Sequence, residues 1–171
     1  MGHRIMHEHV MCHSVHGHRV KIEMTFRFKQ TQEIGYCIDF KEIRRIGGQW
    51  LEDTMDHGFV ANPHDEVMIN TCQQLESKLY LMSLNGEKEY CNPTAENIAK
   101  EIFMAMEILF ASFSGLEIYH VRYTETPNCW VDTYKGSVHK TERENFYLLR
   151  EQDIAAYAKD KGVIEYDSRK L

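Results

Sequence analysis

The stretch HRVKIEMTFRF, residues 18–28, decides the fold because its side chains alternate in character along the segment. Apolar residues fall at every second position, and charged residues such as Arg19 and Lys21 fall between them. A period of two is typical of a strand with one face in the core and one in solvent. The sequence therefore predicts a strand over 18–28, whose core face is Val20, Ile22, Met24, Phe26 and Phe28.

A short strand and then a helix are expected after this segment. YCIDF, residues 36–40, has the composition of a strand. Asp39 followed by Glu42 resembles a capping box, and apolar residues then recur at helical spacing over residues 43–51. The adjacent glycines at 47–48 weaken that helix by about 1 kcal/mol each.

A longer helix is expected in the second half of the chain. Pro93 and Thr94 form a start signal, and Gly115 marks the end of the apolar pattern. The predicted core face of this helix is Ile98, Ile102, Phe103, Met106, Leu109 and Phe110. The remaining expected elements are strands at 79–84, 116–124 and 129–134, a turn at 85–90 and a helix near 150–160.

This order of elements predicts an α+β domain with an antiparallel sheet and two helices on one face. We expect one domain over residues 1–171, with a core at 3–134 and a C-terminal extension at 135–171. A sheet this small exposes its edge strands, and another copy of the chain is the simplest cover. The sequence therefore predicts a homo-oligomer.

Composition narrows the choice of partner and compartment. The formal net charge of -6, without a block of Lys and Arg, argues against nucleic acid as the main partner. No apolar run is long enough to span a membrane, which predicts a soluble, cytoplasmic protein. The odd number of cysteines, without paired spacing, indicates reduced thiols, and Cys37, Cys72 and Cys91 are expected to be inert and buried.

Histidine is the abundant residue type, with ten in the chain. His16 and His18 lie two residues apart where the predicted strand begins, so both imidazoles can reach one ion. Three protein ligands and one open position is the arrangement of a catalytic zinc site. The alternative is that the two imidazoles merely pack or lie in solvent.

Three other features of the sequence are candidates for a catalytic or binding role. Cys12 lies four residues before His16 and is a candidate base or nucleophile, although it can also ligate zinc. Asp56 and His57 form a candidate proton relay if the backbone bends between them, and chance proximity on the surface is the alternative. Glu125, at a strand end, can accept two parallel N–H bonds from an amino-pyrimidinone ring, or be an ordinary exposed acid.

The order of these motifs resembles a known family. The motifs are His3-Arg4, Cys12-x-x-x-His16-Gly17-His18, Gly35-x-x-x-Asp39-Phe40, Asp56-His57, Pro93-Thr94-Ala95-Glu96-Asn97 and Thr124-Glu125-Thr126. Over residues 3 to 134 the chain resembles the 6-pyruvoyltetrahydropterin synthase family. Within this family, an interval of three residues between Cys12 and His16 is similar to the pattern of the bacterial 6-carboxytetrahydropterin synthases of queuosine biosynthesis.

The resemblance implies roles for particular residues. Zinc would be held by His3, His16 and His18, with His7 or His9 as alternatives to His3. Cys12 would be the catalytic base, and Asp56 and His57 would complete the relay, with a subunit boundary as one place for it. Glu125 would anchor the pterin, with Thr94 and Glu96 lining the same pocket. The implied fold is the tunnelling fold, in which subunits close a barrel as trimers that pair into a homohexamer.

The implied reaction converts 7,8-dihydroneopterin triphosphate to 6-carboxytetrahydropterin, acetaldehyde and triphosphate. This is a zinc-dependent lyase activity on carbon–oxygen and carbon–carbon bonds. Two alternatives stay within the family: a 6-pyruvoyltetrahydropterin synthase, or a folate-pathway aldolase, although that branch has glutamate where this chain has Cys12. A third is a protein that binds zinc without catalysis.

Overall fold

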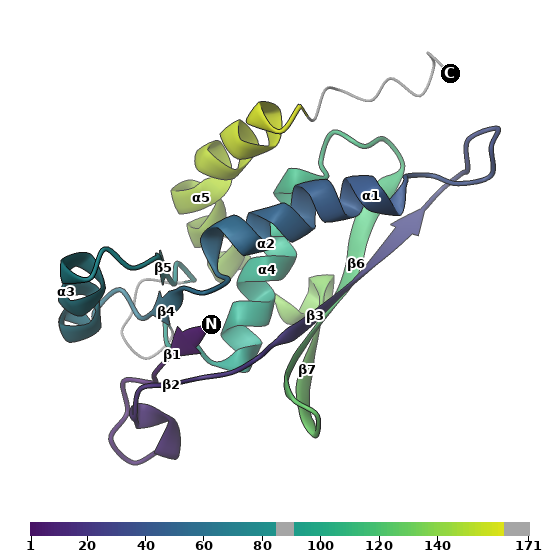
Figure 1. Ribbon diagram of the computed structural model, residues 1–171. Helices are drawn as coiled ribbons and strands as arrows, with labels where there is room; N and C mark the ends of the chain where they lie inside the picture. Colours follow the sequence, from purple (N-terminus) through teal and green to yellow (C-terminus); the bar gives the residue numbers. More distant parts are fainter. Residues whose placement is uncertain (85–90, 163–171) are drawn as a thin grey trace.

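The three-stranded sheet is built around the segment that the alternating pattern identified (Figure 1). The structure is a computed structural model, and it describes residues 1–84 and 91–162. The strands run in the order β3-β6-β7, and both pairs are antiparallel. Their bounds are β3 (Lys21–Phe28), β6 (Leu116–Thr126) and β7 (Cys129–Tyr134). The alternation of β3 is confirmed, but Phe28 at its end is 56% exposed.

A second sheet pairs the start of the chain with strands from residues 59–81. Its strand order is β2-β1-β4-β5, and the pairs β1–β4 and β4–β5 are parallel, which the prediction of one antiparallel sheet did not include. The strands are β1 (Gly2–His3), β2 (His16–Gly17), β4 (Phe59–Ala61) and β5 (Leu79–Leu81). His16 therefore lies in a different sheet from β3, and His18 lies in the connection between them.

The first helical segment begins one turn earlier than expected and replaces a predicted strand. It consists of α1 (Phe40–Ile43), a π-helical turn η2 (Arg44–Gly48) and α2 (Gln49–Thr54). The strand prediction for 36–40 was wrong, because Asp39 caps the helix by accepting a hydrogen bond of 2.9 Å from the Lys41 backbone N–H. The Asp39 carboxylate, which resembled part of a capping box in the sequence, therefore marks the start of a helix at these residues instead of a strand.

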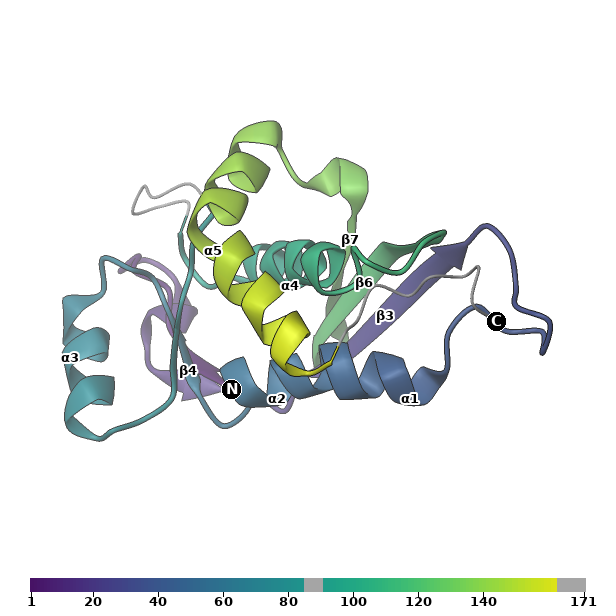
Figure 2. The ribbon, with the colours of Figure 1, turned by 90° about the horizontal axis from the view of Figure 1, so that it is seen from above.

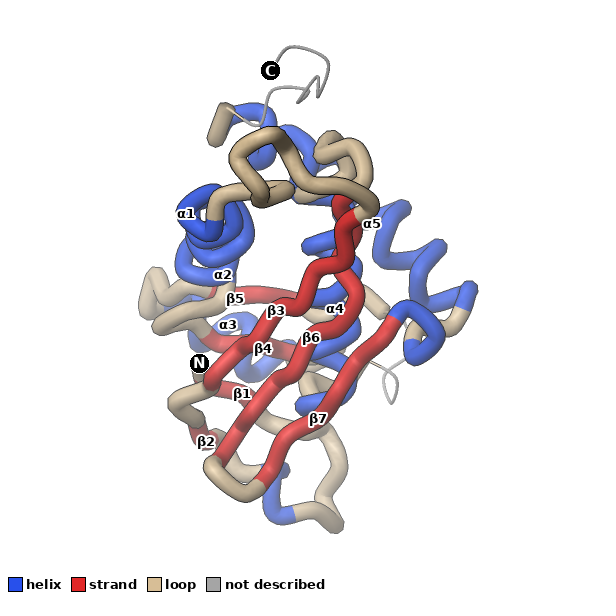
Figure 3. The backbone as a smooth tube through the Cα atoms, turned by 90° about the vertical axis from the view of Figure 1, so that its right-hand side faces the viewer, coloured by secondary structure: helices blue, strands red, loops and turns tan. Residues whose placement is uncertain are grey.

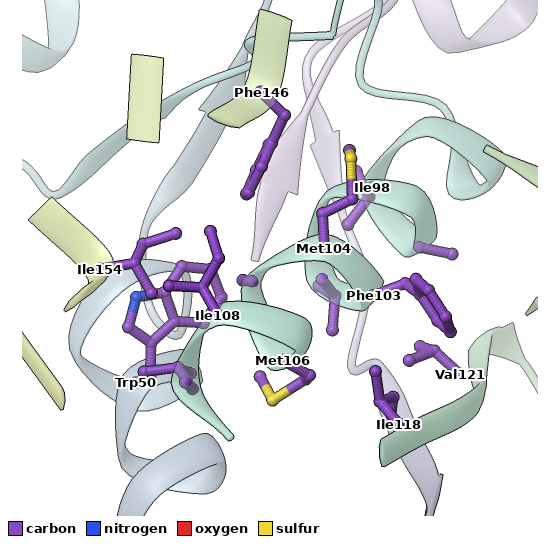
Figure 4. Packing of buried hydrophobic residues seen from close by; sticks show 14 of the residues in the cluster. Trp50, Ile98, Phe103, Met104, Met106, Ile108, Ile118, Val121, Phe146 and Ile154 are labelled. Carbon is purple, nitrogen blue, oxygen red and sulfur yellow. The ribbon is translucent and has the colours of Figure 1, made fainter. Parts of the chain in front are cut away.

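Helix α4 (Ala95–Leu109) is the centre of the core. Thr94 caps it, with Oγ1 accepting a hydrogen bond from the Asn97 backbone N–H at 3.3 Å. The predicted apolar face is confirmed, since residues such as Ile98, Phe103 and Met106 have no exposed surface. Figure 4 shows these side chains packed with Trp50 of α2, Val121 of β6 and Ile154 of the C-terminal helix.

Three short elements complete the second sheet and its surroundings. Helix α3 (Glu66–Gln74) connects β4 to β5, and a single 3-10 turn, η1 (Met11–His13), lies between β1 and β2. The predicted strand at 79–84 is confirmed for β5, although its regular pairing ends at Leu81. The predicted turn at 85–90 lies outside the described residues.

The C-terminal extension forms a longer helix than the charged sequence predicted. After the turn η3 (Lys135–Ser137), helix α5 (Lys140–Asp160) crosses α4, as seen from above in Figure 2. Its start is fixed by Glu142, which accepts a hydrogen bond of 2.8 Å from the His139 backbone N–H. Phe146 and Ile154 belong to the same buried cluster as α4, so the extension shares the core.

The architecture is therefore a mixed α+β arrangement of two sheets and several helices. Figure 3 looks onto the three-stranded sheet, with α4 behind it. No helix in the described part of the chain has the length and apolar character needed to cross a membrane.

Candidate metal centre

Three imidazoles meet where β1 and β2 pair. His3 lies opposite His16 in the antiparallel register of the two strands, and His18 follows two residues later. The ring centroids lie 4.5 Å apart for His3–His16, 5.5 Å for His3–His18 and 5.1 Å for His16–His18. One ligand atom from each residue falls within 4.8 Å of the other two, which is a spacing that one metal ion can bridge.

Backbone carbonyls orient two of these rings. Nδ1 of His3 lies 2.8 Å from the Pro93 carbonyl oxygen, and Nδ1 of His16 lies 2.7 Å from that of Ser14. A carbonyl oxygen only accepts, so Nδ1 carries a proton, and in the neutral ring Nε2 is then the nitrogen with the free lone pair. This is the tautomer that metal-binding histidines adopt when a carbonyl partner holds the other ring nitrogen.

The environment of His3 fits a zinc ion. The residue is 3% exposed, and its Nε2 atom is buried without a hydrogen-bond partner among the described residues. Burial lowers the pKa of this imidazole, and the nearby His16 acts in the same direction. A neutral imidazole with an unsatisfied, buried nitrogen is a suitable zinc ligand, and buried polar atoms are otherwise rarely left unpaired.

Glu125 lies between the imidazoles and a surface cavity. Its Oε1 atom is 3.5 Å from Nε2 of both His3 and His18. Glu125 and Glu96 also line a cavity of about 400 Å³ beside the β6–β7 turn. Thr94 is close in sequence, but its hydroxyl caps α4 and the residue is not part of the cavity lining. The structure thus brings together two of the three residues predicted to hold the pterin.

Cys12 is close in the chain but separate from the three-histidine group. It lies in the η1 turn, partly buried, and its carbonyl accepts a hydrogen bond of 2.8 Å from the Ile5 backbone N–H. The one group of three or more potential metal ligands within the described residues does not contain it. Its role as a base rather than a ligand stays a prediction.

Asp56 and His57 pair with each other as the bent backbone required. Nδ1 of His57 lies 2.9 Å from Oδ2 of Asp56, and His57 has the left-handed φ of 55° that brings adjacent side chains together. The hydrogen bond from His57 lowers the pKa of Asp56. Asp56 lines a cavity of about 200 Å³ together with His18, whereas the His57 side chain is 94% exposed. The pair therefore lies at the edge of the centre, with its imidazole in solvent.

The alternative first ligands do not reach the centre. His7 and His9 are exposed, and they line a different cavity of about 460 Å³. His3 rather than either of them completes the three-histidine group.

Sequence reasoning missed a set of buried polar residues beside His3. Asn62, Asp65 and Asn92 are all buried, and each contacts the segment around His3 directly or through another member. The only sequence signal was the Asn92-Pro93-Thr94 turn, which the start of α4 already accounted for.

Comparison with known proteins identifies the family of this chain. The profile of the family described as 6-pyruvoyl tetrahydropterin synthase matches residues 1–136. The 6-carboxy-5,6,7,8-tetrahydropterin synthase of Rickettsia bellii is 33% identical over 136 residues, covering 77% of this chain and 91% of the relative. The enzyme of the same name from Rickettsia conorii is 34% identical over 139 residues, with the same coverage. The one from Haemophilus influenzae is 26% identical over 127 residues, covering 71% and 82%.

A solved structure shares the fold. The crystal structure of an uncharacterized protein from Wolinella succinogenes has a TM-score of 0.56 at 16% identity, covering 78% of this chain and 92% of that one. At that identity it bears on the fold alone. The profile match and the Rickettsia relatives decide the family, and the chain belongs to the 6-pyruvoyl tetrahydropterin synthase family.

Proposed function

We propose that this chain is a zinc-dependent 6-carboxy-5,6,7,8-tetrahydropterin synthase. It would convert 7,8-dihydroneopterin triphosphate to 6-carboxytetrahydropterin, acetaldehyde and triphosphate, for queuosine biosynthesis in the cytoplasm. The observation that carries the proposal is the convergence of His3, His16 and His18, where the buried Nε2 atom of His3 makes no hydrogen bond among the described residues. The names of the relatives support the choice of this branch.

Each residue of the site would have its own role in the reaction. His3, His16 and His18 hold the ion, which when bound supplies Lewis-acid polarisation of the side-chain hydroxyls of the substrate. Cys12 would act as the base that removes a proton from the substrate side chain. Asp56 orients the imidazole of His57, which returns a proton.

Binding of the ring would use the cavity next to the metal centre. The carboxylate of Glu125 accepts N–H bonds from the amino-pyrimidinone edge, and Glu96 faces the same space. Because Oε1 of Glu125 is 3.5 Å from two imidazoles, a ring bound there has its side chain close to the ion. Thr94 is assigned to this pocket by the resemblance, and while its Oγ1 accepts the helix-cap bond from Asn97 the hydroxyl proton can still be donated.

Product analysis tests the proposal. Purified protein loaded with zinc is incubated with 7,8-dihydroneopterin triphosphate, and the pterin and aldehyde products are separated and identified. We expect acetaldehyde and a 6-carboxypterin species. A pyruvoyl product, or glycolaldehyde in place of acetaldehyde, would assign the chain to another branch. Tight zinc binding without any turnover would instead identify a protein that only binds the metal.

A further inference from the structure

His3 is the metal-centre residue with the least regular structure around it. It belongs to β1, a strand of two residues, so few ladder hydrogen bonds hold the backbone there. Its ring is held by the Pro93 carbonyl at 2.8 Å, from a turn that lies 90 residues later in the chain. The direction of Nε2 therefore depends on how firmly that turn is tied to the segment around His3.

Asn92 makes that connection with its side chain. Its Oδ1 atom accepts a hydrogen bond of 2.9 Å from the Met6 backbone N–H and one of 3.1 Å from Asn62 Nδ2. Asn92 is 7% exposed and Asn62 is fully buried, so water competes little for these contacts. One side-chain oxygen thus joins the segment that follows β1, the residue that follows β4 and the turn that holds the His3 ring.

The backbone of Asn92 ties the same turn to helix α4. Its carbonyl oxygen accepts hydrogen bonds from the Thr94 backbone N–H at 2.8 Å and from Asn97 Nδ2 at 3.0 Å. Because α4 is the most buried element of the core, the Pro93 carbonyl occupies a fixed position relative to the sheet. Because the turn is bonded both to α4 and to the His3 ring, it limits the movement of that ring relative to the core.

A second contact holds the other side of His3. Arg4 donates two hydrogen bonds to Asp65, at 2.6 Å from Nε and 2.5 Å from Nη2. Asp65 is 1% exposed and also accepts a bond of 3.2 Å from the Met68 backbone N–H at the start of α3. Burial acts to raise the pKa of Asp65, but the bonds from Arg4 and Met68 outweigh it and the pKa is lowered. This pair fixes the chain next to His3.

We propose that Asn92 is a positioning residue for the metal centre, which aims Nε2 of His3 at the point shared with His16 and His18. The inference rests on the proposed function in that these three imidazoles bind zinc. It assigns Asn92 no contact with the ion. Outer residues that orient a ligand typically contribute about 10–100-fold to metal affinity. The same turn leads into Thr94 and Glu96, so Asn92 also joins the metal centre to the proposed pterin pocket.

The experiment measures metal binding by the full chain, without reference to turnover. The zinc dissociation constant is determined by competition with a chelator for the wild type, Asn92→Ala and Asn70→Ala. Asn70 is an exposed residue of α3 and serves as the matched control. We expect Asn92→Ala to weaken zinc binding by about 10–100-fold and Asn70→Ala to leave it unchanged. Zinc affinity within twofold of the wild type in Asn92→Ala would overturn the proposal.

Cobalt substitution separates positioning from stability. The visible absorption of bound Co²⁺ reports ligand geometry, so we expect altered bands in Asn92→Ala. Asn92→Asp keeps an acceptor oxygen for both N–H groups and should bind zinc more tightly than Asn92→Ala. A residue with a merely structural role would lower the unfolding temperature of the metal-free chain while leaving the Co²⁺ spectrum unchanged, and that result also overturns the proposal.

Two further outcomes are decisive. If Asn92→Ala does not fold, Asn92→Ser gives the same comparison: weaker zinc binding supports positioning, and wild-type affinity overturns it. If the wild type itself binds no zinc, the proposed function fails together with this inference. If the wild type binds zinc and the variants bind it equally well, only the role of Asn92 fails.

Discussion

His16 and His18 belong to one short segment, and His3 reaches them from the neighbouring strand. Replacing either His16 or His18 by Ala leaves two imidazoles, so we expect zinc to be lost from the purified protein. His7→Ala is the matched control, because His7 is exposed and outside the three-histidine group. Metal analysis of the three variants checks this. Full zinc retention in both His16→Ala and His18→Ala would show that the site is assigned to the wrong residues.

Cys12 is the second residue whose role a single substitution separates. We expect Cys12→Ala to keep zinc and its fold but to lose turnover by about 10²–10⁴-fold, the usual cost of removing a general base. The structure is consistent with this, since Cys12 lies outside the three-histidine group. Zinc content and steady-state rates are measured on the same preparation. A fall in zinc content would make Cys12 a ligand.

Two adjacent glycines in the first helical segment are expected to behave in opposite ways. A β-carbon at Gly47 would lie 2.8 Å from Met106 Sδ and 3.2 Å from a ring carbon of Phe110, so Gly47→Ala requires these two buried side chains to shift. We expect a loss of about 1–3 kcal/mol in the free energy of unfolding.

Gly48→Ala is the matched control. Its β-carbon would meet only the Arg44 side chain, at 3.4 Å, and its backbone is helical, with φ -62° and ψ -47°. We expect it to stabilise the fold by about 0.4–1 kcal/mol through the smaller entropy of the unfolded chain. Urea unfolding of both variants decides the matter, and equal effects of the two substitutions would contradict this account of the helix contact.

The free energy of unfolding is expected to depend on pH through Asp132 of β7, which is bonded to β6. Arg122 donates two hydrogen bonds to Asp132 across the strands, at 2.7 and 2.8 Å, and His120 Nε2 lies 2.7 Å from the same carboxylate. Hydrogen bonding from Arg122, with a further contribution from His120, lowers the pKa of Asp132 from its ordinary 3.8 to about 2. A lowered carboxyl pKa stabilises the fold above pH 3.8, and that stabilisation is lost as the pH falls through about 2.

We therefore expect Asp132→Asn to be less stable than the wild type at pH 7. The difference should shrink at pH 3, because below its ordinary pKa of 3.8 the Asp132 carboxylate takes up a proton in the unfolded chain before it does so in the folded one. Urea unfolding at the two pH values measures it. A difference that is the same at both values would mean that Asp132 contributes through packing rather than through its charge.

For the whole molecule, both outer strands of the three-stranded sheet have one unpaired edge within the described residues, since β3 and β7 each pair with β6 alone. Beside β3, a largely apolar cavity of about 760 Å³ is lined by residues that include Phe28, Tyr36 and Phe40, and Phe40 is 85% exposed. Unpaired edges and exposed aromatic rings favour association with another copy. We expect a homohexamer built as a dimer of trimers, with the pterin pocket near a subunit contact.

Sedimentation velocity at low protein concentration tests the assembly, with activity measured in the same samples. We expect an oligomer that retains turnover on dilution. A stable, active monomer would contradict the proposed assembly and would also remove the reason for placing His57 at a subunit boundary.

The sequence by itself determined the features that depend on local patterns of residues. The period of two in 18–28 and the apolar face of α4 each state which side of an element is buried, so β3 and the core helix were predictable. The spacing of His16 and His18 likewise places two imidazoles together. The strand prediction at 36–40 failed because two local signals overlapped, and the hydrogen bond accepted by Asp39 favours the helix.

Only the tertiary structure decided the features that join distant segments. The parallel pairs of β4 depend on strands of two or three residues, too short to give a pattern. His3 becomes a candidate ligand through its register with His16, and its tautomer depends on a carbonyl 90 residues away. The Asn92-Pro93-Thr94 turn signals only the start of α4 in the sequence, because the importance of Asn92 comes from burial and from two N–H donors that the fold brings to one oxygen. Long-range contacts of this kind leave no periodicity in a single chain.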